Sequence, residues 1–309
     1  MLLEVNQKEF ESRFSSAPHP FLESVFLELN KQKVERLVYL LPDNKSKIQL
    51  GMIAGIKDDR ILSPFSAPFG GLHFRHNSVL SSQFDHFVNE IKLYIEKNNL
   101  RGFKLTLPPD IYHQSINSKM VNSLVRADFK MKTPEITCSV DLKSWNSDFT
   151  DANTRRNYRK AVKYDLKFRQ VEDLVQKEVV YNLILENRKS RSRPLHMKFS
   201  DILMTNEIWP IDYFQVLDGS NIVVASAIIY RAHKKIVYAT FLGDTKLGRS
   251  LKSMTFLIFN LWNHYKSLEF ETIDWGISTE LGEPNEGLLR FKECHEGISS
   301  LRYSFEFEF

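Results

Sequence analysis

The sequence predicts an α/β protein with mixed sheets that is built from two copies of one unit. From Phe241 to Gly297 the predicted order is strand, loop, long apolar helix, strand and short helix, the pattern of a βα crossover. The first half repeats this order at similar spacing, with a hairpin, a Gly-rich turn, a long helix, a strand and a helix. A repeated order indicates duplication, so we expect two tandem domains, at 1–150 and 151–309.

In the first half, helical periodicity and β-branched alternation mark the elements. Two prolines and two glycines interrupt Ser63–Leu72, which predicts an irregular, bulged strand at that point. The expected helices are Gln7–Ser15, Phe21–Lys31, Gln83–Lys97 and Tyr112–Val125. The expected strands are Val34–Leu41, Ile48–Ile56, Ile61–Phe74, Phe103–Leu107 and Ile136–Leu142, with a turn at Asp43–Lys45.

In the second half, the helix Ser250–Ser267 is apolar around nearly its whole circumference and must be buried. Ser250 is its expected N-cap, which would leave the backbone N–H groups of Gly248 and Arg249 free to bind an anion. A simple turn is the alternative, since one glycine and one arginine make an incomplete fingerprint. Other expected elements are Val175–Arg188 and Asn285–Glu293 as helices, and Tyr213–Leu217, Val223–Tyr230, Ile236–Leu242, Thr272–Trp275 and Leu301–Phe307 as strands.

A basic stripe is expected on the helix Asn153–Lys163. Like charges repel at this spacing, so an anionic partner such as a phosphate, a diphosphate or a nucleic acid backbone would explain the stripe. The alternative is a solvated linker helix balanced by Asp151 and Asp165. Arg188–Pro194 is a second basic segment, either a loop that closes over a ligand or a flexible connection. The stripe consists of Arg155, Arg156, Arg159, Lys160 and Lys163.

Composition and motifs exclude several classes of protein. The 309 residues carry a net charge of only +4, so the overall charge is no argument for nucleic acid. The sequence contains no GxSxG, HExxH or Walker A motif, and the two cysteines and nine histidines show no ligand spacing, so we expect no metal. A signal peptide and a membrane span are not expected. We therefore expect a cytoplasmic protein, with association at the inner membrane surface left open.

Two segments resemble a known family. Asn153–Phe168 resembles the segment that leads into the second domain of the FemAB-like branch of the GNAT acyltransferase superfamily. Asp274–Ser278, followed by Asn285–Glu293, resembles the closing motif of that branch, Gly-Leu-x-x-Phe-Lys. The resemblance implies two tandem GNAT-like domains. It also implies transfer of an acyl or aminoacyl group from coenzyme A or aminoacyl-tRNA to an amine, often on a cell-wall precursor.

The same resemblance assigns roles to residues. It implies that Lys292 binds the substrate or stabilises the charge of the reaction, with a surface pair to Glu296 as the alternative. Asp274 is a candidate for proton removal. The pattern departs from the family in having Gly248 without a second glycine. The implied acyl-donor site consists of Leu242, Gly243, Gly248, Arg249 and Ser250, and the expected substrate-binding residues are Arg155, Arg156, Arg159 and Asn285.

The sequence is compatible with two functions. The first is an N-acyltransferase that uses acetyl-CoA, another acyl-CoA or aminoacyl-tRNA, with an amine acceptor that is phosphorylated or lipid-linked. The second is a catalytically silent module that binds an anionic polymer, a nucleotide sugar or a lipid-linked precursor through its basic segments. The Ser63–Leu72 turn lacks the arginine of the second half. We therefore expect the first domain to be degenerate as a donor site and to shape the acceptor channel.

Overall fold

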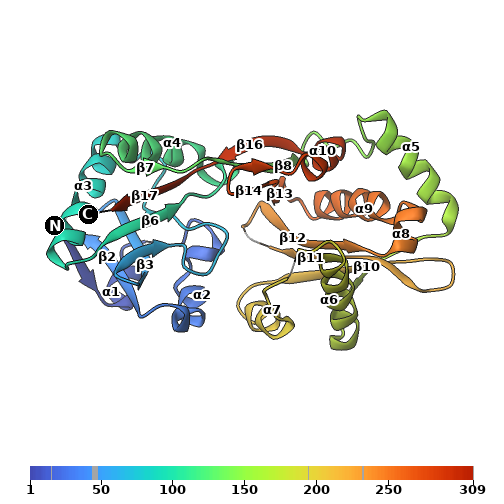
Figure 1. Cartoon of the computed structure of the whole chain (residues 1–309), viewed down its shortest axis with the longest axis horizontal. Coiled ribbons are helices and arrows are strands. Elements are labelled where there is room, and N and C mark those ends of the chain that lie inside the picture. The colour runs from blue at the N-terminus through green and yellow to red at the C-terminus, as the bar shows by residue number, and fades with distance from the viewer. Residues whose placement is uncertain (15, 44–47, 194, 232, 309) are drawn as a thin grey trace. The chain divides into compact units, whose positions relative to one another are not determined.

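The chain forms two compact units (Figure 1). The structure is a computed structural model, which describes residues 1–14, 16–43, 48–193, 195–231 and 233–308. Unit 1 comprises Met1–Ile136, Glu280–Glu283 and Ser300–Phe309, and unit 2 comprises Thr137–Thr279 and Pro284–Ser299. Each unit combines a mixed sheet with helices, so the predicted α/β class is confirmed.

Unit 1 is built on an eight-stranded sheet with the order β1-β2-β3-β4-β6-β17-β7 and with β5 paired to β3. Strands β4 and β6 run parallel, and the pairs on either side of them are antiparallel. This parallel pair requires a crossover connection, and the long helix α3 lies in it. The strands are β1 (Leu2–Val5), β2 (Arg36–Pro42), β3 (Leu50–Lys57), β4 (Arg60–Ser63), β5 (His73–Phe74), β6 (Gly102–Thr106), β7 (Lys130–Met131) and β17 (Ser304–Glu308).

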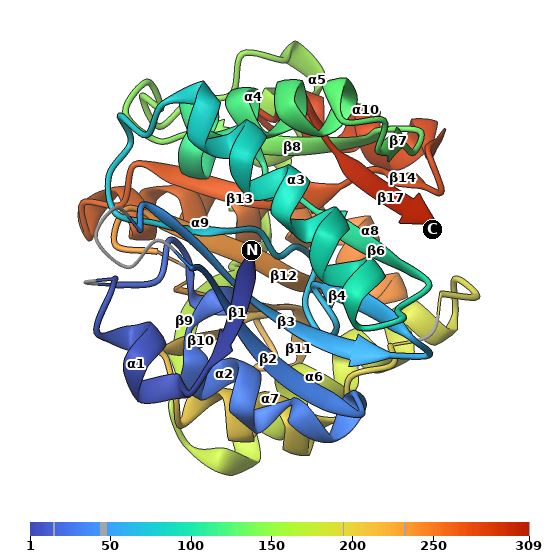
Figure 2. The same ribbon diagram turned by 90° about the vertical axis from the view of Figure 1, so that its left-hand side faces the viewer.

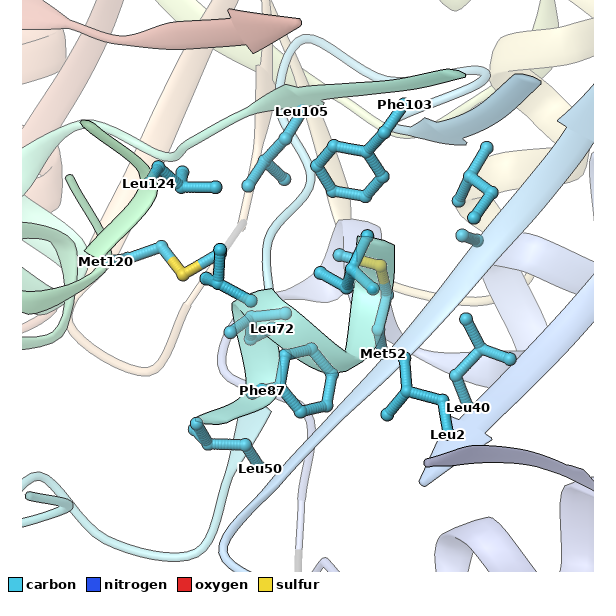
Figure 3. Packing of buried hydrophobic residues seen from close by; sticks show 14 of the residues in the cluster. Leu2, Leu40, Leu50, Met52, Leu72, Phe87, Phe103, Leu105, Met120 and Leu124 are labelled. Carbon is cyan, nitrogen blue, oxygen red and sulfur yellow. The ribbon is translucent and has the colours of Figure 1, made fainter. Parts of the chain in front are cut away.

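Helices cover both faces of this sheet (Figure 2). The two long helices lie on one face and the two short ones on the other. Between the sheet and the long helices lies an apolar core, in which Met52 and Phe103 of the strands approach Phe87 and Met120 of the helices (Figure 3). The helices are α1 (Gln7–Glu11), α2 (Ser24–Leu29), α3 (Ser81–Lys97) and α4 (Asp110–Arg126).

Unit 2 is built on a seven-stranded sheet with the order β16-β8-β13-β12-β11-β10-β9. Its one parallel pair is β12–β13, among the pairs of this sheet whose direction the described residues define. A separate small ribbon joins β14 (Thr279–Glu280) to β15 (Glu283–Pro284). The strands of the large sheet are β8 (Glu135–Asp141), β9 (Lys167–Val171), β10 (Ile211–Leu217), β11 (Val223–Tyr230), β12 (Ile236–Asp244), β13 (Thr272–Ile277) and β16 (Ile298–Arg302).

The long apolar helix α9 packs on one face of the unit 2 sheet, and α6 packs on the other (Figure 1). One side of α9 buries Leu261 and Trp262 in the core, and its other side carries Phe259, which stacks on Tyr158 of α5 at a centroid distance of 3.8 Å. Helix α9 is thus covered by the sheet on one side and by α5 on the other, which explains why it is apolar all round, as predicted. The helices are α5 (Ala152–Ala161), α6 (Leu174–Lys189), α7 (Phe199–Asn206), α8 (Lys246–Leu251), α9 (Ser253–Ser267) and α10 (Glu286–Cys294).

Apart from β5, which lies off the main strand order, the two sheets match strand for strand, which confirms the predicted duplication. The parallel pair β4–β6 of unit 1 corresponds to β12–β13 of unit 2, and each is followed by an antiparallel strand, β17 or β8. Strand β8 comes directly after β7 in the chain, and β17 comes directly after β16. Each copy of the repeat therefore gives its last strand to the sheet of the other copy.

Some elements differ from the sequence expectations. The single strand expected at Leu301–Phe307 is two strands, β16 and β17, which belong to different sheets. The edge strands β1 and β9 and the helices α7 and α8 were not predicted, because short edge strands and one- or two-turn helices carry little periodicity. Residues 15, 44 and 45, which complete the expected first helix and the expected turn at Asp43–Lys45, lie outside the described residues. Within those residues, no helix combines the length and the apolarity needed to cross a bilayer.

Candidate active site

The candidate site begins where two parallel strands of unit 2 part. Strands β12 and β13 pair only from Ile236↔Thr272 to Tyr238↔Asp274, although β12 continues to Asp244. Gly276 bends β13 with φ of +67°, a left-handed conformation that favours glycine. From Ala239 onward, the described part of β12 has no ladder pairing with β13. Ligands of α/β proteins collect at such carboxyl ends of strands.

Lys292 of α10 lies buried at this bend, with 3% of its surface exposed. Its Nζ donates hydrogen bonds to the carbonyl oxygens of Gly276 and Ile277, each at 2.8 Å. Burial lowers the pKa of Lys292 to about 8, and the nearby Cys138 and Asp274 partly oppose this shift. The expected alternative of a surface lysine paired with Glu296 is wrong, because Glu296 accepts hydrogen bonds from Thr150 instead.

Asp274 holds the same bend from β13 itself. It is 1% exposed, and its Oδ1 accepts a hydrogen bond of 2.9 Å from the backbone N–H of Gly276. The structure therefore brings together the two predicted catalytic residues, Lys292 and Asp274, around one glycine. An ammonium with three N–H groups donates two of them to carbonyls, which leaves one donor for a further partner.

Helix α10 is fixed by residues at its two ends. Asn285, a predicted substrate-binding residue, is its N-cap, and the Asn285 Oδ1 accepts from the backbone N–H of Leu288 at 3.1 Å. At the other end, His295 Nδ1 lies 2.7 Å from the carbonyl of Phe291, and Nε2 lies 3.0 Å from the hydroxyl of Thr255 on α9. These contacts lock α10, and with it Lys292, against α9.

The segment after β12, expected to be a loop, is the short capped helix α8. Thr245 caps α8: its Oγ1 accepts from the backbone N–H of Gly248 at 2.9 Å, and its carbonyl accepts from the N–H of Arg249. Ser250 lies inside α8 and donates to the carbonyl of Leu247, so its expected role as an N-cap is wrong. The backbone N–H groups of Gly248 and Arg249 were expected to be free. This is wrong, because both donate hydrogen bonds to Thr245.

Packing requires a glycine at position 248, because a Cβ there would come within 2.2 Å of the carbonyl oxygen of Val224. At Gly243, in β12, a Cβ would lie 3.0 Å from the Cα of Ile184, a tight contact. Contact with the protein itself therefore accounts for Gly248 and leaves little space at Gly243. Leu242, the remaining hydrophobic residue of the expected donor site, packs at the border of the unit 2 core.

A buried carboxylate organises the arginines near α8. Asp244 Oδ1 is 3.1 Å from Arg249 Nη1 and 3.3 Å from Arg191 Nη2, and it also accepts from Asn187 Nδ2 at 2.9 Å. Arg249 thus uses one of its five N–H groups on Asp244 and stays 46% exposed. The sequence analysis missed Asn187, although a polar amide at helical spacing from the apolar Val180 and Ile184 was a usable signal.

The boundary between α8 and α9 is a single residue in an unusual backbone conformation. Lys252 joins α8 to α9 with φ of +60° and ψ of +31°, the left-handed conformation in which glycine is favoured. A lysine therefore occupies the position in which the backbone conformation calls for glycine.

The basic stripe lies on α5 and on the 3-10 turn Val162–Tyr164 that follows it, which contains Lys163. Arg155 pairs with Asp148 at 3.5 Å and donates to the carbonyl of Thr150. Asp151, expected to balance the charges, instead caps the helix through the N–H of Thr154 at 2.7 Å. The remaining basic side chains of the stripe are exposed and form no ion pair with any residue that the structure describes: Arg156, Arg159, Lys160 and Lys163.

Arg188 is half-buried at the end of α6. Its guanidinium lies 5.9 Å from the centroid of the Phe241 ring on β12. Burial and the charge of Arg193 lower the pKa of Arg188, while Tyr238 raises it. No carboxylate within the described ranges pairs with Arg188, and its buried Nε has no hydrogen-bond partner there.

Comparison with known proteins gives a fold but no sequence family. No protein-family model and no curated protein sequence matches the chain. Among solved structures, FemX is similar over 100% of this chain and 97% of its own, with 12% identity and a TM-score of 0.69. L-PGS from Bacillus licheniformis is similar over 98% of this chain and 92% of its own, with 12% identity and a TM-score of 0.59.

A further match is a tandem GNAT protein from the clavulanic acid biosynthesis pathway. It is similar over 100% of this chain and 98% of its own, with 8% identity and a TM-score of 0.54. These likenesses span nearly the whole length of each partner. At this level of identity they establish the fold alone. The chain has a tandem GNAT-like fold, similar to that of FemX, L-PGS and the tandem GNAT protein.

Proposed function

We propose that this chain transfers an acyl or aminoacyl group from a coenzyme A or tRNA carrier to an amine. The single observation that carries the proposal is the bend of β13 at Gly276, held by the buried Lys292 and Asp274 beside the unpaired edge of β12. The fold supports it: one similar structure is a tandem GNAT protein, solved without AcCoA, and another is L-PGS.

The reaction would proceed by direct attack of the amine on a thioester or ester carbonyl. A new C–N bond forms, and the carbonyl electrons move to oxygen. The C–S or C–O bond to the carrier then breaks as the oxyanion returns its electrons, and the amine proton leaves to a base or to the departing carrier. We propose that the third N–H of Lys292 stabilises the oxyanion in this water-poor site.

Asp274 is the proposed proton acceptor. Replacing it by asparagine keeps an oxygen that can accept from the N–H of Gly276 and removes the basic carboxylate. Loss of a general base typically slows a reaction by about 10²- to 10⁴-fold. Unchanged turnover in Asp274→Asn, with the fold intact, would reduce Asp274 to a residue that positions the bend.

The donor would lie along the loop after β12, at Leu242, Gly243, Gly248, Arg249 and Ser250. Arg249 keeps four N–H groups that Asp244 does not use, which can bind the pyrophosphate of coenzyme A. We also propose a domain boundary near residue 150, with the donor site in the second domain and no donor site in the first. The Ser63–Leu72 segment of unit 1 contains no arginine to match Arg249.

The acceptor is proposed to be an amine on a cell-envelope or sugar precursor that carries phosphate or a lipid. Arg156 and Arg159, exposed on α5 without ion pairs among the described residues, can bind such phosphates, with Arg155 beside them. Asn285 would contribute through its side-chain amide N–H groups, because its oxygen caps α10. A cytoplasmic protein that acts at the inner membrane surface fits this acceptor.

A second function is kept because of the same cations. Three basic side chains on α5 and Lys163 just after it, none of them in an ion pair among the described residues, would together with the half-buried Arg188 also serve a silent module that binds an anionic polymer. Binding of that kind weakens steeply with salt and releases no thiol from acetyl-CoA. Salt-sensitive binding without any thiol release would favour the module over the enzyme.

The deciding experiment is a thermal-shift series with acetyl-CoA, longer acyl-CoAs, free coenzyme A, aminoacyl-tRNA and UDP-sugars. A ligand that binds only the native state raises the melting midpoint. We expect a shift with coenzyme A species or aminoacyl-tRNA that Arg249→Ala abolishes. The matched control Arg101→Ala removes an exposed arginine of unit 1 and should leave the shift unchanged. No shift with any carrier would overturn the proposal.

A further inference from the structure

A groove in unit 1 shares no residue with the candidate active site. It is formed by α1, by Phe14, Ser16 and Ala17 after α1, by α2 with the preceding Glu23, and by the start of β5, and its volume is about 400 Å³. Figures 1 and 2 both show α1 and α2 next to each other on the face of the sheet opposite α3 and α4. A cavity of this size is in the range of small-ligand sites.

The charges that line this groove are all negative. Of its lining residues only Glu11 and Glu23 carry charge, because the buried His73 is neutral: burial lowers the pKa of His73 to about 3. Glu11 accepts a hydrogen bond from Gln7 at 2.9 Å. The Glu23 carboxylate forms no hydrogen bond or ion pair with any described residue, and burial raises its pKa.

The base of the groove is apolar and rigid. Phe10 and Phe14 pack against the His73 ring at centroid distances of 4.9 and 5.6 Å. Both phenyl rings also press on Gly51 of β3, where an added Cβ would come within 2.9 Å of either ring. Val25 of α2 lines the same groove with 52% of its surface exposed, which offers an aliphatic contact at the rim.

A cation would stabilise the half-buried Glu23 carboxylate, and the other lining groups decide which cation fits. A metal ion is a poor fit, since the described residues contain no group of three His, Cys, Asp or Glu side chains that could hold one. A cation with a hydrocarbon chain fits both the Glu23 carboxylate and the apolar contacts of Val25 and Phe14.

We propose that this groove binds a primary alkylammonium group, such as the end of a lysine-type side chain or of an aliphatic diamine. The ammonium donates hydrogen bonds to Glu23, with Glu11 adding a second negative charge. The alkyl chain lies along Val25 and the wall formed by Phe14. The site is independent of the proposed transferase activity, because it can be occupied whether or not unit 2 binds an acyl carrier.

The test measures binding of n-pentylamine by ligand-observed NMR at neutral pH, with 1-pentanol as the uncharged probe of the same length. We expect saturable binding in the millimolar range, weakened about tenfold or more in Glu23→Gln and for 1-pentanol. The control Glu178→Gln removes an exposed carboxylate of unit 2 and should bind pentylamine as the wild type does. Glu23→Gln should fold normally, because it removes an unpaired charge.

Three results would overturn the proposal: no saturable binding of pentylamine, equal affinity in Glu23→Gln and wild type, or equal affinity for 1-pentanol. Val25→Ser gives a second measurement on the apolar contact. We expect it to weaken pentylamine binding, and a shorter probe, methylamine, to bind equally to Val25→Ser and wild type. Coenzyme A binding in the same variants reports on unit 2 separately, so failure of this site leaves the transferase proposal standing.

Discussion

Asp274 and Lys292 hold opposite sides of Gly276: the Asp274 Oδ1 accepts from its N–H at 2.9 Å, and the Lys292 Nζ donates to its carbonyl at 2.8 Å. The parallel pairing of β12 and β13 ends at Asp274, two residues before this glycine. The two buried charged residues thus fix the point at which the strands part. Asp274 and Lys292 therefore have a structural role at this bend in addition to the catalytic roles proposed for them.

The first prediction concerns the buried ammonium. Lys292→Met should destabilise unit 2, because two buried carbonyls lose their donor, each worth about 1–3 kcal/mol. The difference in unfolding free energy between wild type and Lys292→Met should grow as the pH rises. In the wild type the folded-state pKa is about 8 and the unfolded-state value 10.5, so between these values the unfolded state binds more protons and the stability of the wild type rises with pH.

Urea unfolding at pH 7.5 and pH 10 measures this effect. All four tryptophans, Trp145, Trp209, Trp262 and Trp275, lie in unit 2, so their fluorescence reports that unit alone. We expect the gap in unfolding free energy between wild type and variant to widen by about 2 kcal/mol at the higher pH. A gap that stays constant would show that the ammonium is not desolvated.

Most of the fold could be predicted from the sequence, because the hydrophobic periodicity is clear in the helices and strands that are buried. The apolar circumference of Ser250–Ser267 indicated a helix between two layers, and the β-branched runs of the second half indicated β10, β11 and β12. The partner of a strand is set by tertiary contacts, so the split of Leu301–Phe307 into β16 and β17, in two sheets, left no local signal.

The candidate site was predicted in part, by motif and not by periodicity. The spacing of Asp274 and Lys292 placed two groups that the structure brings to one glycine. The loop was misjudged for a physical reason. Gly248 suggested an open anion site, but it is a glycine because Val224 lies too close for a Cβ, and the cap that uses its N–H, Thr245, was not recognised.

A second prediction contrasts two glycines. Gly248→Ala should destabilise unit 2 by about 2 kcal/mol or more, because its Cβ would meet a backbone oxygen 2.2 Å away. Gly287→Ala should instead stabilise by about 0.5–1 kcal/mol, since this position is exposed inside α10 and its Cβ would have only an ordinary contact at 3.8 Å. Tryptophan-monitored urea unfolding of both variants provides the comparison, and effects of the same sign would contradict the packing account.

A third prediction concerns the helix boundary at Lys252. Its left-handed backbone costs about 1 kcal/mol for a residue with a Cβ, and glycine removes this cost. We expect Lys252→Gly to raise the unfolding free energy of unit 2 by up to about 1 kcal/mol, measured in the same way. Lys252→Ala is the control, because it removes the charge and keeps the Cβ. Equal stabilisation by both changes would point to the lysine charge instead.

The last prediction concerns acid stability and His295. Its Nδ1 faces a carbonyl oxygen, so Nδ1 carries the proton and the unprotonated Nε2 accepts from the Thr255 hydroxyl. Burial lowers the pKa of His295 to about 4, below the ordinary 6.5. Between these values the unfolded state binds one more proton, so unit 2 should lose up to about 3 kcal/mol as pH falls from 6.5 to 4. In His295→Gln this part of the loss should disappear, which urea titrations at pH 6.5 and 4.5 can measure by tryptophan fluorescence. An unchanged pH dependence in the variant would mean that His295 is charged in the folded protein.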